Sequence, residues 1–161
     1  MNIVQPRFET FPETTLTGIR MAMSLVENKT GILWKNFMMQ RNNISNSLGT
    51  DLFSIQRYSP SYFSDFNPSH PFEKWAAVEI SAAARTPEGM ETIIIPKGLY
   101  AVFFYKGLST DPSIFQYIFS SWLPQSGYVL DDRPHFEKLG EKYQNNHPDS
   151  EEEIWIPVRK R

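Results

Sequence analysis

The sequence predicts an α+β domain, in which two principal helices pack on one side of a curved, mostly antiparallel sheet. Two observations predict this class. Most segments have the alternation and β-branched residues of strands, and only two stretches carry apolar residues at helical spacing. The elements also come twice in the order strand–helix–strand–strand, which predicts tandem duplicated βαββ units. We therefore expect a single domain, residues 1–161, with pseudo-repeat halves of about 1–83 and 90–161.

The first half begins with a Thr-rich segment, residues 7–23, whose apolar and polar side chains alternate. This alternation predicts one extended strand, in which Gly18 allows a bulge or a close approach. Residues 31–44 then carry apolar side chains at helical spacing, with Asn28 or Thr30 as the N-cap. Two shorter strands complete this half, residues 52–58 and 74–81, with a loop rich in Pro and Ser between them.

The second half opens with residues 91–105, which a Pro-Lys-Gly sequence divides into two strand segments. Residues 111–123 form a helix, because an Asp-Pro pair supplies its cap and first residue and five apolar side chains form one stripe. Two strands complete this half, residues 134–139 and 153–158. A duplicated unit has a pseudo-twofold axis, and the central groove along this axis is a natural place for a ligand. Gly18 and Gly98 are expected at equivalent points of the two halves.

Composition and charge exclude several classes of protein. The 161 residues hold 16 Lys and Arg against 18 Asp and Glu, so the basic excess of a nucleic-acid-binding protein is missing. The absence of cysteine excludes disulfide scaffolds, thiolate zinc sites and cysteine nucleophiles. Residues 93–105 are too short and too interrupted to span a bilayer, and the first residues lack the order of a signal peptide. We therefore expect a cytoplasmic protein that binds neither nucleic acid directly nor a membrane.

The chain lacks the residue patterns of common catalytic and cofactor sites. No P-loop, dinucleotide-binding glycine motif, nucleophile elbow or zinc-protease motif occurs. The three histidines are far apart in sequence, so we expect no metal, no cofactor and no catalytic residues of the usual hydrolytic types. Aromatic residues, in contrast, make up 14% of the chain, and such side chains fill cores or line pockets for flat or cationic ligands.

Two glutamates in predicted strands are candidates for a pocket carboxylate. By strand alternation, Glu137 shares a face with His135, and Glu153 shares a face with Trp155. A carboxylate in a groove is costly to desolvate unless it is paired, so both positions also fit a glutamate at the rim of a wet sheet face. The first two members of the acidic run 151–153 are expected to be solvated at the start of the last strand.

Three stretches of the second half carry a resemblance to a known family. They are I-P-K-G-L-Y-A-V-F-F-Y-K-G, then W-L-P-x-S-G-Y followed by D-x-P-x-F-E, and finally E-I-x-I-P-V. Together they resemble the GyrI-like small-molecule-binding domain. This is the effector-binding domain of AraC-type and MerR-type multidrug regulators, and it also occurs as stand-alone gyrase-inhibitor-like proteins. The resemblance covers essentially the whole chain and is strongest over residues 95–158. The fold of the family, two βαββ units around a central groove, agrees with the element order above.

The resemblance implies a pocket for hydrophobic, often cationic, small molecules, with aromatic walls and a buried glutamate as counter-charge. The position that matches this glutamate is Glu137, although the family usually has Tyr where Leu139 stands, and Glu153 is the second choice. The aromatic candidates for the pocket are Phe53, Tyr58, Trp75, Phe115, Trp122 and Trp155. Of these, Phe115 and Trp122 equally fit the packing of a helix on the sheet.

We therefore expect a stand-alone bacterial binding protein for hydrophobic, cationic small molecules, which senses or sequesters a drug or effector. Because the resemblance fills the chain, there is no room for a helix-turn-helix, and a separate DNA-binding regulator is a candidate partner in transcription regulation. Two alternatives stay open. One is a GyrI-like hydrolase of reactive electrophiles, with Glu137 or Glu153 as general base. The other is a gyrase-inhibitor-like interaction with DNA gyrase.

Overall fold

The computed structural model of the protein describes residues 4–161. Its strands are β1 (Arg7–Phe11), β2 (Thr14–Met23), β3 (Leu52–Arg57), β4 (Phe72–Glu79), β5 (Glu91–Ile95), β6 (Gly98–Lys106), β7 (Tyr128–Leu130), β8 (His135–Leu139) and β9 (Glu151–Lys160). Its helices are α1 (Thr30–Gln40), extended by a 3₁₀ turn over Arg41–Asn43, and a second segment made of α2 (Ser113–Tyr117), a π-helical turn over Ile118–Trp122 and α3 (Leu123–Gln125).

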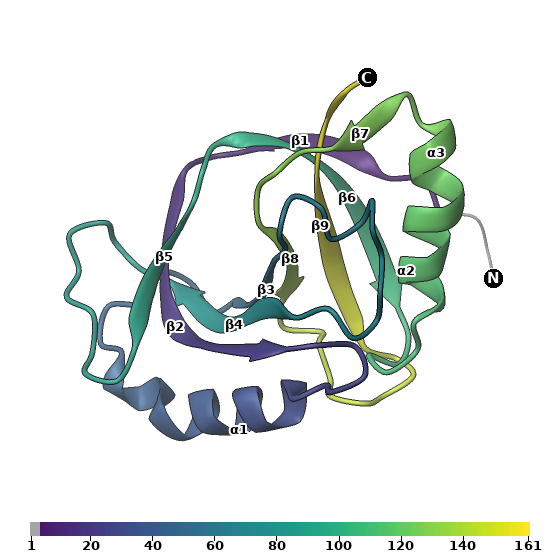
Figure 1. Cartoon of the computed structure of the whole chain (residues 1–161). Helices are drawn as coiled ribbons and strands as arrows, with labels where there is room; N and C mark the ends of the chain where they lie inside the picture. Colours follow the sequence, from purple (N-terminus) through teal and green to yellow (C-terminus); the bar gives the residue numbers. More distant parts are fainter. Residues whose placement is uncertain (1–3) are drawn as a thin grey trace.

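The strands form one antiparallel sheet in the order β1-β6-β9-β8-β3-β4-β2-β5, and β7 pairs with β9. Every strand pairing within residues 4–161 is antiparallel. In Figure 1 the sheet curves strongly, with α1 beside β2 and β4 and the second helical segment beside β6. The predicted α+β class with a mostly antiparallel sheet and two principal helices is confirmed.

The two edge strands are exchanged between the two parts of the sheet. Residues 7–23 were expected to be one strand, but Pro12 and Glu13 separate it into two strands. β1 pairs with β6, while β2 pairs with β5. In the same way β5 precedes β6 along the chain but pairs with β2. From one edge the order is β1, β6, β9 and β8, and from the other edge it is β5, β2, β4 and β3. In both directions, an edge strand is followed by the strand before a helix, then by the last strand of that half, and then by a strand that follows the helix. This order supports our proposal of two pseudo-repeat halves.

Both helices pack on the same face of the sheet. Leu33 and Phe37 of α1 pack against residues of β2 and β4, and Ile114 and Ile118 pack against residues of β6 and β9. The opposite face buries a separate cluster rich in aromatic side chains: Phe11, Leu16, Phe53, Ile55, Trp75, Ala77, Ile93, Ile95, Tyr100, Val102, Phe136 and Trp155. Since strand side chains alternate, each central strand presents a different set of residues to each face.

Polar side chains bind backbone amides at the starts of the helices. The backbone N–H of Thr30 donates to Oδ1 of Asn28 at 2.9 Å, and that of Ser113 donates to Oδ1 of Asp111 at 2.9 Å. The N-cap of α1 is nevertheless Lys29 rather than the predicted Asn28 or Thr30, and that of α2 is Pro112 rather than Asp111. α1 is shorter than the predicted 31–44, because its last residues form the 3₁₀ turn. None of the helices within residues 4–161 is long and apolar enough to cross a membrane.

Gly18 and Gly98 both lie where a side chain has no room, but for different reasons. A Cβ on Gly18 would lie 1.9 Å from the carbonyl oxygen of Ala76 on the neighbouring strand β4. A Cβ on Gly98 would lie 2.1 Å from Nη1 of Arg133. Gly98 pairs with the last residue of β1, and the corresponding residue of β2, which pairs with the last residue of β5, is Thr14. The expectation that Gly18 and Gly98 are equivalent was therefore wrong.

Candidate functional site

Four polar side chains form a patch on the two central strands, between the helices. Ser54 of β3 pairs with Glu137 of β8, and Gln56 pairs with His135. Their neighbours along the strands, including Phe136, point into the aromatic cluster of the opposite face, so the four polar residues face the helix side. Ser54, Gln56 and His135 are buried, and Glu137 is half-buried. We call this patch of the sheet, between α1 and the second helical segment, the central groove.

A second carboxylate, Glu152 of β9, faces the same groove. Glu152 lies on the same face of β9 as Ile154 and Ile156, which pack against the second helical segment. Only 7% of Glu152 is exposed. Burial and then the neighbouring Glu137 raise the pKa of Glu152 well above its usual range, and Lys74 lowers it to a smaller extent.

The two carboxylates have little compensating positive charge. Nε2 of Gln56 donates to Oε1 of Glu137 at 3.3 Å. Among the ion pairs within residues 4–161, none includes Glu137 or Glu152. Nor do three His, Asp or Glu side chains of this part of the chain come together in a group that could hold a metal ion. The groove therefore contains an acidic pair, buried Glu152 and half-buried Glu137, that has no ion-pair partner in the part of the chain that the structure describes.

Aromatic side chains from the β3–β4 segment cover this polar patch. Phe63 stacks on His135, with ring centroids 5.5 Å apart, and on Phe119 of the second helical segment at 4.9 Å. Tyr58 contacts His135 edge-on at 4.9 Å, and Tyr62 packs against Tyr58 at 4.6 Å. In Figure 1 the β3–β4 loop lies across the centre of the molecule, in front of β9. Residues 60–65 form turns, with no long helix between β3 and β4.

Burial beneath this cover changes the acid–base properties of the groove. The pKa of His135 is lowered to about 3, because burial disfavours its charged form and the positive charge of Arg133 adds to this effect. Burial also raises the pKa of Tyr58, and the neighbouring Tyr62 and Glu137 add to the shift. At neutral pH both rings are therefore uncharged, and they present apolar or hydrogen-bonding surfaces to a ligand.

The π-helical turn over Ile118–Trp122 interrupts the second helical segment beside the groove. Such turns inside α-helices are rare and are frequent at functional sites. Phe119, in this turn, stacks on Phe63 and lies 6.1 Å from the ring of His135. The turn therefore contributes one wall of the aromatic cover.

The structure separates the eight residues that the sequence proposed for one pocket. Glu137 and Tyr58 lie in the central groove. The buried side chains of Phe53, Trp75 and Trp155 belong to the aromatic core on the opposite face. Trp122 and Phe115 pack in the core beneath the second helical segment, as the alternative for these two residues stated. A single pocket cannot contain all eight residues, because the sheet itself lies between the two groups.

Glu153, the second choice for the pocket carboxylate, lies with Trp155 on the face opposite the groove. Nε1 of Trp155 donates to Oε1 of Glu153 at 3.2 Å, and Nη2 of Arg7 donates to Oε2 at 2.8 Å. The same arrangement occurs in the first half, where Nε1 of Trp75 donates to Oε1 of Glu73 at 2.6 Å.

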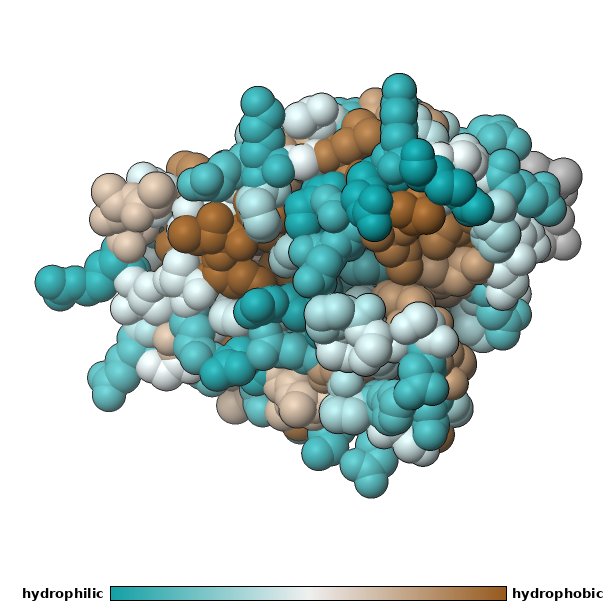
Figure 2. All heavy atoms as spheres, turned by 45° about the horizontal axis from the view of Figure 1, so that its top comes forward, coloured by the Kyte–Doolittle hydropathy of each residue, from teal (hydrophilic) through white to brown (hydrophobic). Residues whose placement is uncertain are grey.

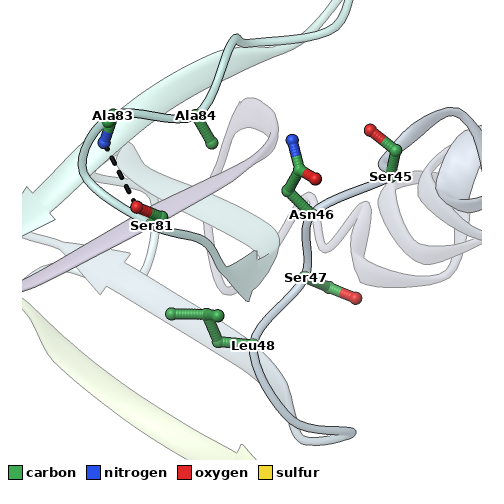
Figure 3. A pocket seen from close by; sticks show the side chains of 7 residues that line it. All are labelled: Ser45, Asn46, Ser47, Leu48, Ser81, Ala83 and Ala84. Atoms are coloured by element: carbon green, nitrogen blue, oxygen red, sulfur yellow. Dashed lines mark hydrogen bonds between the residues drawn. The ribbon is translucent and has the colours of Figure 1, made fainter.

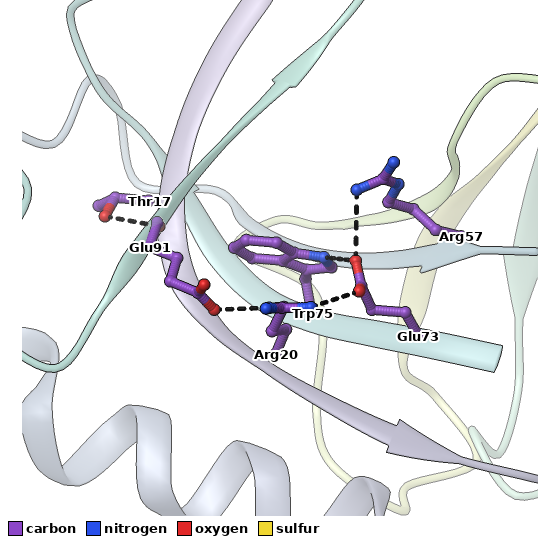
Figure 4. Close-up of polar contacts among 6 residues, drawn as sticks. All are labelled: Thr17, Arg20, Arg57, Glu73, Trp75 and Glu91. Atoms are coloured by element: carbon purple, nitrogen blue, oxygen red, sulfur yellow. Dashed lines mark hydrogen bonds and ion pairs between the residues drawn. The ribbon is translucent and has the colours of Figure 1, made fainter. Parts of the chain in front are cut away.

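Arginines neutralise Glu73 as well (Figure 4). Nη1 of Arg20 donates to its Oε2 at 2.8 Å, and Nη1 of Arg57 donates to its Oε1 at 3.4 Å. Glu73 and Glu153, on this face, thus already have an arginine partner, whereas Glu137 and Glu152 form no ion pair within residues 4–161.

Sequence reasoning missed Glu152, Phe63 and Phe119. Glu152 was expected to be solvated as part of an acidic run, but it is buried. Strand alternation could have identified it, because Glu152 shares a face with Ile154 and Ile156, which face the helices. No pattern in the sequence marks Phe63 and Phe119, because one lies in a loop and the other in a π-helical turn.

Two surface hollows lie away from the groove. The larger, of about 550 Å³, is a shallow depression lined by Ser45, Asn46, Ser47, Leu48, Ser81, Ala83 and Ala84 (Figure 3). A second, of about 210 Å³, adjoins it and shares Ser45, Asn46 and Ala84. Neither is lined by an aromatic side chain. Seen from the side of β1 and β7, two apolar patches are divided by a hydrophilic band (Figure 2).

Comparisons with known proteins identify the family and the fold. The sequence matches the GyrI-like small molecule binding domain over residues 4–159. The structure of SAV2435 bound to tetraphenylphosphonium is similar with a TM-score of 0.75 at 13% identity, over 96% of this chain and 94% of that chain. The EcmrR C-terminal domain gives a TM-score of 0.72 at 14% identity, over 99% and 100%. A hydrolase from Listeria innocua gives 0.60 at 9% identity, over 96% and 92%. Such low identities show a shared fold alone, and no curated protein sequence matches the chain.

Proposed function

Because the chain belongs to the GyrI-like family of small-molecule-binding domains, we propose that it binds hydrophobic cations in the central groove. In this proposal Glu137 and Glu152 supply negative charge, and Tyr58, Phe63 and Phe119 supply apolar surface. The observation that carries the proposal is the acidic pair of buried Glu152 and half-buried Glu137, which lies beside the aromatic rings around His135 and forms no ion pair within residues 4–161.

The energetics of the groove favour a large, weakly hydrated cation. A charged ligand loses hydration when it enters, and a carboxylate that is already desolvated replaces part of this stabilisation. Aromatic faces add about 0.5–2 kcal/mol each by cation–π attraction, and more when the contact is shielded from water. A small inorganic cation loses much more hydration on entry, so that the aromatic rings compensate a smaller share of its cost. The groove therefore favours organic cations over metal ions.

Entry of a ligand requires the β3–β4 segment to move. Phe63 lies between His135 and Phe119, where a ligand would have to reach the carboxylates. The segment around it is formed by turns, which open at a lower free-energy cost than the central strands. The related fold of SAV2435 is known with tetraphenylphosphonium bound, so this cation is the natural first probe.

A calorimetric titration with a matched pair of ligands tests the proposal. Tetraphenylphosphonium is a permanent cation, and triphenylphosphine oxide is a neutral molecule with similar aromatic groups. We expect the Glu137→Gln substitution to weaken binding of the cation by about 1–3 kcal/mol and to leave the neutral ligand nearly unchanged.

Glu153→Gln is the control for this titration, because Glu153 lies on the opposite face and is paired with Arg7. Equal losses for the two ligands in Glu137→Gln would assign a structural role to Glu137. Selective loss of the cation in Glu153→Gln would instead place the ligand on the other face of the sheet.

A second candidate function is hydrolysis of a reactive electrophile, which the acidic pair specifically favours. One carboxyl of the pair is held protonated beside another carboxylate, and such unequal environments allow one group to act as general acid and the other as general base. Glu137 would remove a proton from water as it attacks a strained ring, and Glu152 would give its proton to the leaving oxygen. Ring opening of an epoxide above the background rate, lost in both Glu137→Gln and Glu152→Gln, would establish this activity.

A further inference from the structure

We propose that the central groove exchanges a proton for its cationic ligand: Glu152 holds a proton beside Glu137 when the groove is empty and releases it when a cation binds. This inference rests on the proposed function and adds its coupling to pH. It predicts that the net charge of the groove stays the same before and after binding. The ligand would then be a cation that competes directly with hydrogen ions.

The geometry of the pair supports a proton on Glu152. β8 and β9 are adjacent, with Glu137 opposite Ile154, so that Glu152 lies diagonally across from Glu137 on the same face. Glu152 is buried, and neither side chain has an ion-pair partner within residues 4–161. Two neighbouring carboxylates shielded from water repel each other when both are ionised, and a proton on Glu152 removes this repulsion while the groove is empty.

The other groups that face the pair do not replace this proton. Lys74 of β4 is the nearest source of positive charge, but its Nζ donates to Oγ1 of Thr30 at 3.0 Å and forms no ion pair with either carboxylate. His135 of β8 is neutral, because its pKa is lowered to about 3. Gln56 of β3 donates a hydrogen bond without charge.

The remaining titratable neighbours are tyrosines, which are uncharged at neutral pH. Tyr58 and Tyr62 lie in the cover. Burial, and to a smaller extent neighbouring acidic groups that include Glu152, raise the pKa values of Tyr105 of β6 and Tyr143 of the β8–β9 loop. The compensating positive charge must therefore come from a proton or from a ligand.

Proton release gives the affinity a defined dependence on pH. A bound cation stabilises the ionised form of both carboxylates, so the complex holds one proton fewer than the empty protein. Where the empty pair is protonated, each unit of increase in pH should tighten cation binding by up to about tenfold. Above the pKa of the pair the affinity should become constant. A neutral ligand should show neither effect.

Calorimetry at several pH values measures the exchange directly. Tetraphenylphosphonium and ethidium are suitable probes, because they are permanent cations, and any released proton then comes from the protein. Titrations in phosphate and in Tris, which differ in ionisation enthalpy, give the number of protons released per ligand. We expect about one proton per cation near neutral pH, none with triphenylphosphine oxide, and an affinity for the cations that rises between pH 6 and pH 8.

Two variants identify the source of the proton, and their folding is checked by thermal unfolding. Glu152→Gln should still bind the cation but release no proton, and its affinity should no longer change with pH. Glu153→Gln should behave like the wild type. Proton release that persists in Glu152→Gln would overturn the inference.

The wild-type titrations decide the inference even if a variant does not fold. Binding of both cations with the same heat in the two buffers and the same affinity at every pH would overturn the exchange and leave the proposed function standing. If neither cation binds at any pH, the proposed function fails, and the exchange fails with it.

Discussion

Replacement of His135 by Phe should make the protein less sensitive to acid. His135 is buried in the groove, where Phe63 stacks on its ring and Tyr58 contacts its edge. Phenylalanine keeps an aromatic ring at this position but cannot take up a proton. The variant therefore isolates the contribution of histidine protonation to stability.

The magnitude follows from the difference in pKa between the two states. In the unfolded chain His135 titrates near its ordinary value of 6.5, and in the folded protein its pKa is lowered to about 3. As the pH falls, the unfolded state therefore binds the proton first, so stability is present above pH 6.5 and is lost between pH 6.5 and pH 3. Between pH 7 and pH 5, this linkage removes about 2 kcal/mol of stability from the wild type.

Urea denaturation at pH 7 and at pH 5 measures this loss. The free energy of unfolding of His135→Phe should fall by about 2 kcal/mol less than that of the wild type over this range. Other groups, including Glu152, titrate in both proteins and cancel in the comparison. His147→Gln is the control, because His147 is exposed in the β8–β9 loop and its replacement should leave the pH dependence unchanged. If His135→Phe and the wild type lose equal stability, then His135 is protonated in the folded protein and the argument from burial is refuted.

Three further predictions concern the acidic pair, the cover and the sheet. Because the pKa of Glu152 is raised on folding, its contribution to stability is complete below its unfolded pKa and is lost as the pH rises. In urea denaturation, the free energy of unfolding of Glu152→Gln should therefore increase relative to that of the wild type from pH 5 to pH 8. A difference that stays constant over this range would contradict the prediction. Phe63→Ala should speed association of tetraphenylphosphonium in stopped-flow measurements, whereas Phe66→Ala, which removes an exposed ring that contacts Tyr62, should not; equal rates in all proteins would show that the cover does not limit entry. Gly18→Ala should destabilise the fold by about 2 kcal/mol or more, because its Cβ would meet the carbonyl oxygen of Ala76. Gly31→Ala in α1 has free space and should stabilise the helix by up to about 1 kcal/mol. Equal melting temperatures of the two variants in calorimetry would refute this.

The fold could be predicted from the sequence because local patterns determine its elements. Alternation identified most strands, and helical spacing with an Asp-Pro start identified the second helix close to its position. The break between β1 and β2 was missed, because the alternating pattern continues on both sides of Pro12 while the pairing partner changes. Strand β7 was also missed, because its three residues are too few to show a period.

The site could be predicted only in part, because it depends on which face of each strand meets the helices. Strand alternation predicted that Glu137 shares a face with His135, and its role as the pocket carboxylate stays a prediction. The choice of Trp75, Trp155 and Glu153 failed to bring these residues together with Glu137, because tryptophan side chains are as suitable for a core as for a pocket. Phe63 reaches the groove from a loop, and its contacts depend on tertiary structure that no local pattern encodes.

The exchange of the edge strands determines how the chain can mature during synthesis. A chain that has left the ribosome only as far as residue 84 has β1 but not β6, with which β1 pairs, and it has β2 but not β5 to cover the outer edge of β2. Neither half can pair the outer edge of its own part of the sheet, so we expect a stable fold to form only when both halves are present. Each half then contributes an edge strand that pairs with the other half, so we expect the two halves to unfold together. A ligand that binds at the centre of the sheet should therefore raise the free energy of unfolding of the whole domain, and not of one half alone.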